Sequence, residues 1–160
     1  MADPADNAGG GAPSDNTTIA RRLIERRVEN VAIRPIWDPI AVRLCFDAGE
    51  GAELPLRIGG KIGPASGAPI DARVTVVGLK RDNWQSGPWG RSGVGDCAAV
   101  RVGGVEIVLL AKRTQALGPE LFINVGINPL TKKIVVLKST NHFTFGPIAK
   151  KVIYSTAMAP

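Results

Sequence analysis

The chain has 160 residues, of which 44% are hydrophobic and 21% are charged. This length allows one domain with a hydrophobic core but is too short for two domains of ordinary size. Twenty Lys and Arg against fourteen Asp and Glu give a net charge of +6, yet the basic residues come as scattered pairs and not as a stripe interleaved with aromatic residues. The composition indicates a soluble globular domain and gives little support to nucleic-acid binding.

Membrane and metal-binding classes are also disfavoured. No stretch approaches eighteen consecutive apolar residues, so no membrane span is expected, and the absence of a secretory signal pattern in residues 1–20 favours a cytoplasmic location. Cys45 and Cys97 lack C-x-x-C spacing, and His142 is the single histidine. Because a zinc site needs several such ligands close together, we expect no metal site in this chain and two buried free thiols.

The N-terminal stretch 5–13 contains three consecutive glycines, Gly9, Gly10 and Gly11, preceded by Asp6 and Asn7. Glycine permits positive φ and close approach of another surface, at an entropic cost. A phosphate loop is disfavoured, because the spacing matches neither phosphate-binding motif and Asp6 would repel a phosphate. We expect a loop that faces a substrate; a flexible tail without function is the alternative.

The next elements are predicted in chain order. Ser14 or Asp15 caps a helix over about residues 16–28. Residues 31–33 form a short strand, and residues 34–39 form a turn because each residue before a proline is pushed out of the helical region. Asp38 caps a second helix with Pro39 at its first position, and this helix ends at Gly49.

From residue 53 onward the pattern is typical of strands. Strands are predicted at 54–58 and 72–78, an irregular stretch at 82–95, a hairpin over 98–110 with a Gly-Gly turn, a helix from about 119, a central strand at 133–137 and a closing helix at 147–152. Trp84 and Trp89 in the irregular stretch either line a binding surface or cover the core, which is the commoner role. The predicted fold class is α+β: a single domain with a mixed or antiparallel sheet and two to four helices.

Three polar clusters stand at the ends of apolar segments: the N-terminal loop, residues 113–115 and residues 138–142. Loops at strand ends commonly carry binding sites, but the sequence does not tell whether these three converge. His142 is the only imidazole available as a base or ligand, although a lone histidine is more often structural. Ser139 and His142 are not predicted as a catalytic pair, because no nucleophile-elbow sequence surrounds the serine.

Six short motifs resemble, in the same order, motifs of the C-terminal domain of the microcystinase-C (MlrC-type) metallopeptidases. They are Ala5–Pro13, Pro35–Pro39, Ile58–Lys61, Gly95–Val100, Arg113–Gln115, and Lys138-Ser139 followed by His142-Phe143. The resemblance spans residues 1–160 and implies a relationship to two-domain zinc hydrolases that act on peptides, the namesake cleaving linearised microcystin. It also implies that the zinc ligands lie in an N-terminal domain absent from this chain.

The resemblance further implies a set of substrate-binding residues and no catalytic or metal-binding ones. The set is Asp6, Asn7, Gly9, Gly10, Gly11, Arg113, Gln115, Lys138 and His142. Residues 1–15 would face the inter-domain cleft of a zinc metallopeptidase, with this chain inactive alone, the N-terminal catalytic domain and a peptide as partners, and oligomerisation left open. The alternative is a stand-alone binding module that has kept the fold. Replacing Asp6 or Arg113 is expected to leave folding largely intact.

Overall fold

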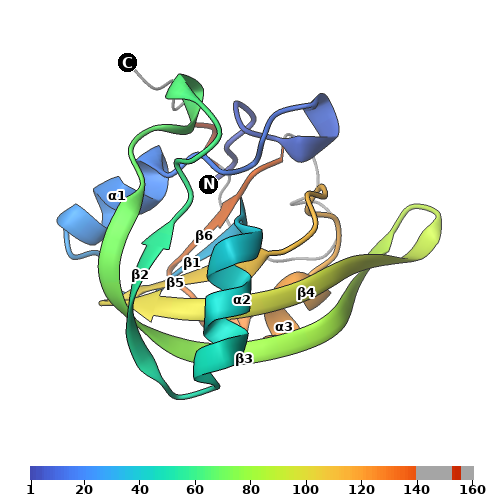
Figure 1. Cartoon of the computed structure of the whole chain (residues 1–160). Coiled ribbons are helices and arrows are strands. Elements are labelled where there is room, and N and C mark those ends of the chain that lie inside the picture. The colour runs from blue at the N-terminus through green and yellow to red at the C-terminus, as the bar shows by residue number, and fades with distance from the viewer. Residues whose placement is uncertain (140–152, 156–160) are drawn as a thin grey trace.

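Figure 1 shows the computed structural model, which describes residues 1–139 and 153–155. His142 and the closing helix predicted at 147–152 lie outside the described residues. In the described part, strands form one six-stranded sheet of order β2-β3-β4-β5-β1-β6. The strands are β1 (Val31–Trp37), β2 (Glu53–Ile58), β3 (Ile70–Gly87), β4 (Gly90–Val102), β5 (Val105–Leu110) and β6 (Ile134–Leu137). The helices are α1 (Thr18–Glu25), α2 (Pro39–Ala48) and α3 (Glu120–Ile123). The predicted α+β class, with a mixed sheet in a single domain, is confirmed.

Local signals in the sequence placed several of these elements correctly. The Asp38 carboxylate accepts a hydrogen bond from the Ala41 N–H at 3.0 Å, with Pro39 in the first turn of α2, and Gly49 ends this helix with φ 89°. The β4–β5 hairpin turns at Gly103-Gly104, with Val102 paired to Val105. Both cysteines are buried free thiols, as expected, and burial raises the pKa of each to about 11.

Four local predictions are wrong. Residues 34–37 continue β1, because a shift in register between Ile33 and Ile36 accommodates Pro35 within the strand. Residues 82–87 and 90–95, predicted to be irregular, belong to the long β3–β4 hairpin. Strand β6 is not central but lies at the edge of the sheet. Helix α1 is preceded by Thr17, which makes no side-chain cap, so neither Ser14 nor Asp15 is its capping residue.

Three neighbouring strands, β5, β1 and β6, run parallel. Ile33 of β1 pairs with Ile107 of β5 on one side and with Val136 of β6 on the other. Their carboxyl ends therefore meet at one side of the sheet, which we call the carboxyl edge and define by the last strand residues Trp37, Leu110 and Leu137. The N-terminal stretch crosses this edge: Ala2 bridges to Leu137, and the Trp37 N–H donates to the Ser14 carbonyl at 2.8 Å.

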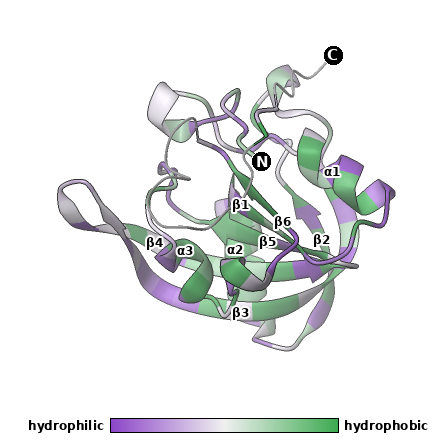
Figure 2. Ribbon diagram, turned by 180° about the vertical axis from the view of Figure 1, so that it is seen from behind, coloured by the Kyte–Doolittle hydropathy of each residue, from purple (hydrophilic) through white to green (hydrophobic). Residues whose placement is uncertain are grey.

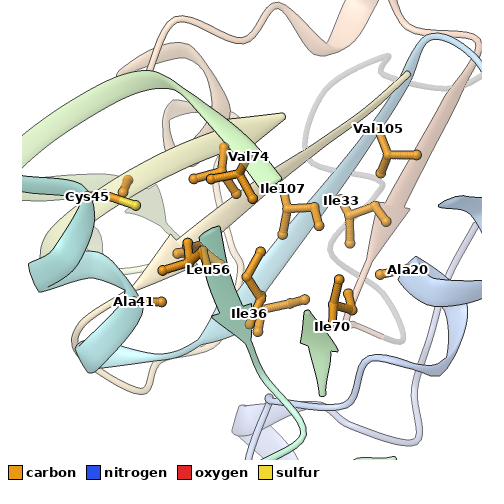
Figure 3. Packing of buried hydrophobic residues seen from close by; sticks show 14 of the residues in the cluster. Ala20, Ile33, Ile36, Ala41, Cys45, Leu56, Ile70, Val74, Val105 and Ile107 are labelled. Atoms are coloured by element: carbon orange, nitrogen blue, oxygen red, sulfur yellow. The ribbon is translucent and has the colours of Figure 1, made fainter. Parts of the chain in front are cut away.

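Apolar side chains cover both faces of the sheet. On the face covered by α1 and α2, Ile33, Ile36 and Ile107 pack with Leu56 and Cys45 (Figure 3). On the opposite face, a second cluster joins β4 and β5 to Leu121 and Phe122 of α3. Figure 2 shows hydrophobic residues concentrated along the central strands and the helices that cover them. This double-sided core fixes the carboxyl edge rigidly, since central strands buried on both faces leave no freedom to slide.

Candidate functional site

The N-terminal loop, residues 113–115 and the described part of the third polar cluster, residues 138–139, meet at the carboxyl edge. Lys138 directly follows β6, and Arg113 follows β5, so the parallel direction of these strands brings both to the same side. The Lys138 ammonium contacts the Asp6 carboxylate of the N-terminal loop. The Arg113 Nη1 donates to the Ala12 carbonyl of the same loop at 2.8 Å. The convergence that the sequence left open is therefore a property of the fold.

Asp6 anchors the N-terminal loop to the end of β6. Its Oδ1 accepts from the Ser14 N–H at 2.7 Å, and its Oδ2 accepts from the Asn16 N–H at 2.7 Å and from the Lys138 ammonium. The ammonium also donates to the Asn16 carbonyl at 2.6 Å. Burial lowers the pKa of Lys138, and the attraction of Asp6 opposes this shift. The expectation that replacing Asp6 leaves folding intact does not fit these contacts, because the change would remove the carboxylate acceptor of a buried ammonium and of two buried N–H groups.

Asp15 and Asp38 fix the turn after β2 in a similar way. Asp15 accepts from the Ser66 hydroxyl at 2.5 Å and from the N–H groups of Lys61 and Ile62 at 2.8 and 3.0 Å. The second carboxylate oxygen of Asp38 accepts from the Gly59 N–H at 2.9 Å and from the Lys61 ammonium at 2.7 Å. Sequence reasoning missed the role of Asp15, although the Gly-Gly-Lys motif in the resemblance pointed to this turn.

The residues of the carboxyl edge that the structure describes do not fit a metal ion. Asp6, Asp15 and Asp38 direct their oxygens to N–H, hydroxyl and ammonium donors, so their lone pairs already have partners. Within residues 1–139 and 153–155, no three His, Cys, Asp or Glu side chains group as metal ligands would. These carboxylates build the loop framework.

The three glycines form an exposed turn above this framework. Asn7 Oδ1 accepts from the Gly9 N–H at 3.0 Å and caps the short 3-10 turn Ala8–Gly10, which ends at Gly11 with φ 92°. A Cβ on Gly9 would collide with the Gln115 side chain, whereas a Cβ on Gly10 or Gly11 would meet no atom within 4 Å. The backbone of Gly11 needs glycine for its positive φ. Gly10 has neither a positive φ nor, among the described residues, an atom close to the position of a Cβ.

Two buried polar side chains that sequence reasoning missed hold the segment that carries Arg113 and Gln115. The Gln85 amide donates to the Gln115 carbonyl at 2.7 Å and accepts from the Leu117 N–H at 2.7 Å. Arg34 is fully buried and donates to the Gly118 carbonyl. No signal in the sequence identified Gln85, which lies in the stretch predicted to be irregular. For Arg34 a signal was available: a charged residue directly after an apolar run indicates a buried side chain that needs a hydrogen-bond partner.

The guanidinium of Arg34 lies 4.8 Å from the centre of the Phe122 ring. Burial lowers its pKa to about 10, and the Glu120 carboxylate opposes this shift. At this edge the Asp3 Oδ1 is buried and has no hydrogen-bond partner among the described residues. Burial raises the pKa of Asp3, against the attraction of Lys138.

The predicted site residues thus separate into two layers. Asp6, Asn7 and Lys138 form the buried layer, while the glycines and Arg113 are exposed at the surface. Gln115, half-buried beside Gly9, joins the two layers. His142 lies outside the described residues.

The fold and the site define an α+β domain with a loop-covered carboxyl edge and, in the part that the structure describes, no metal-ligand group. The chain belongs to the MlrC C-terminal family: the family model described as "MlrC C-terminus" matches residues 1–160. This confirms the family resemblance seen in the sequence motifs.

Two relatives extend the comparison. Microcystinase C from Sphingomonas sp is 38% identical over 156 residues, which are 96% of this chain but 31% of the relative. The crystal structure of a candidate metallopeptidase from Mesorhizobium sp. BNC1 matches with a TM-score of 0.85 and 27% identity, over 99% of this chain and 33% of that one. The chain therefore spans about a third of the length of these relatives. No helix in the described residues is long and apolar enough to cross a membrane.

Proposed function

We propose that this chain is the C-terminal, cleft-forming domain of a zinc metallopeptidase that resembles the microcystin-degrading microcystinase C, and that it is inactive alone. Its support is the family membership together with the span of only about a third of the relatives. In this scheme the zinc ion, which would activate the attacking water, is held by a preceding N-terminal domain. This chain contributes binding and orientation of a peptide substrate.

The observation that carries the proposal is the open space at Gly10. Glycine in a folded loop is entropically costly, and neither a positive φ nor a collision inside the described chain explains it here. Gly63 shares these two properties, but Gly10 also lies on the loop beside Arg113 and Gln115 at the carboxyl edge, so a surface outside this chain that packs against this loop supplies the reason. We take that surface to be the catalytic domain with its bound peptide.

In this proposal the exposed and the buried residues of the carboxyl edge have different roles. The exposed Arg113 side chain uses one nitrogen on the Ala12 carbonyl and has further N–H donors for a substrate carboxylate. Gly9, Gly10, Gly11 and Gln115 shape the surface that the peptide meets, and the buried Asn7 supports it by capping the glycine turn. Asp6 and Lys138 act through the loop, by holding it in place. A substrate contact of His142, cytoplasmic location and oligomerisation stay predictions from the sequence.

The test measures zinc by elemental mass spectrometry and peptide hydrolysis by chromatography, for this chain alone and mixed with the separately produced first two thirds of microcystinase C. We expect no stoichiometric zinc and no turnover for the chain alone, and turnover in the mixture. Gly10→Leu should reduce that turnover at least tenfold, whereas Gly63→Leu, also in open space, should not. Stoichiometric zinc with turnover by the chain alone would refute the proposal. A folded chain that gives no turnover in the mixture would favour the stand-alone binding module.

A further inference from the structure

The distal part of the β3–β4 hairpin, residues 81–96, forms an arm that protrudes from the body (Figure 1). The register defines where it goes. Cys97 of β4 pairs with Leu110, the last residue of β5, and with Lys80 of β3. The residues of the arm therefore extend past the carboxyl edge. At about 3.3 Å per residue, strands of this length reach on the order of 20 Å beyond it.

The root of the arm is fixed to α3. The Asn124 side chain donates to Asn83 Oδ1 at 2.7 Å and to the Trp84 carbonyl at 3.3 Å. The Ser86 hydroxyl donates to the Glu120 carboxylate at 2.9 Å. Because polar contacts from α3 and its C-cap residue hold the strand at residues 83, 84 and 86, the arm has a defined direction and is not a loose loop.

The tip of the arm carries an uncovered aromatic anchor. Trp89 is 95% exposed, and nothing in the described chain packs over it. Below it, the Arg91 guanidinium lies 4.0 Å from the centre of the Trp84 ring. An exposed tryptophan lacks the large favourable free energy that burial of its side chain would give. Trp and Arg are the residue types that contribute most to the binding energy of protein interfaces.

We infer that the arm clasps the preceding two thirds of the longer protein, with Trp89 seated in an apolar pocket of that part and Arg91 beside a carboxylate at the pocket rim. The position of the arm indicates which part of the protein it contacts. The arm extends past the same edge where Gly10 faces open space. The relatives are about three times as long as this chain, so they contain a further part that can fill this space. The inference rests on the proposed function, since it assumes that a catalytic domain lies there.

The experiment measures binding of the full 160-residue chain to the first two thirds of microcystinase C by titration calorimetry. Trp89→Ala should weaken the Kd at least tenfold, and Arg91→Ala at least threefold. Leu130→Ala is the matched control, because Leu130 is 66% exposed but belongs to a turn that bonds to Asn30, at the opposite end of β1; it should change the Kd less than twofold. Circular dichroism and the urea midpoint check that each variant is folded.

The outcomes separate the two proposals. Tight binding that Trp89→Ala leaves unchanged would overturn the role of the arm while the proposed function stands. No binding of the parent chain would overturn the proposed function and the arm with it. A parent chain that self-associates in the analytical ultracentrifuge through Trp89, with unchanged binding of the catalytic part, would assign the arm to a second copy and also overturn the inference.

Discussion

Replacing Asp6 with Asn tests whether the buried ion pair beneath the glycine turn holds the domain together. The variant keeps the shape of the side chain but removes its charge and turns one acceptor oxygen into a donor. The Lys138 ammonium, 3% exposed, would then keep the Asn16 carbonyl as a direct partner and lose its carboxylate. Breaking one side of a buried ion pair costs about 3–5 kcal/mol. A natural domain is stable by only about 5–15 kcal/mol, so this is a large fraction of the total.

The free energy of unfolding is measured by urea denaturation, with the slope of the transition checked for constancy. Asp71→Asn is the matched control: Asp71 also pairs with a cation, Arg57, at 2.7 Å, but both side chains are exposed, so the midpoint should hardly move. Replacing the ammonium as well, in Asp6→Asn with Lys138→Met, should recover part of the loss because no unpaired charge is left buried. The reasoning fails if Asp6→Asn costs no more than Asp71→Asn, or if the double variant is as unstable as the single one.

Two further predictions concern pH and backbone strain. Burial raises the pKa of Asp3 in the folded state, so its contribution to stability is present below its unfolded pKa of about 3.9 and is lost as pH rises through the folded value. Asp3→Asn should therefore stabilise the chain at neutral pH and not at pH 3. If the variant and the parent chain have equal urea midpoints at both pH values, this reasoning is wrong. Gly59→Ala would place a Cβ 2.6 Å from the Asp15 carbonyl at φ 55°, so thermal unfolding should show a loss of more than about 1 kcal/mol, whereas Gly63→Ala, in open space, should not be destabilising.

Local chemistry determined what the sequence could predict. Asp38 with Pro39 caps a helix wherever that helix packs, and Gly103-Gly104 turns a hairpin between neighbouring strands, so both were readable from adjacent residues. The family motifs also located the polar clusters that meet at the carboxyl edge. That meeting itself depends on strand order, which an apolar run such as residues 134–137 does not encode: the same run suits a central strand or an edge strand covered by other segments.

The features that the sequence did not predict depend on partners that lie far away along the chain. Gln85 and Arg34 are buried because they bond to backbone groups at residues 115–118, and no pattern near either residue announces those partners. The arm was not predicted because glycines and polar residues interrupt the alternation of apolar and polar residues along residues 82–95. Hydrogen bonding to the opposite strand keeps these residues extended instead. Asp6 was expected to face a substrate because its partner, Lys138, lies 132 positions away.

That separation in sequence also dictates when the candidate site forms. The contact between Asp6 and Lys138 closes almost the whole chain into one loop, and the two strands flanking β1 both pair with it in parallel over long sequence distances. Such contacts carry the largest loop-closure entropy and form late in folding. During synthesis, the buried ion pair beneath the glycine turn can form only after the codon for Lys138 has been translated. Asp6 therefore gains its ion-pair partner only after almost all of the described stretch has been synthesised.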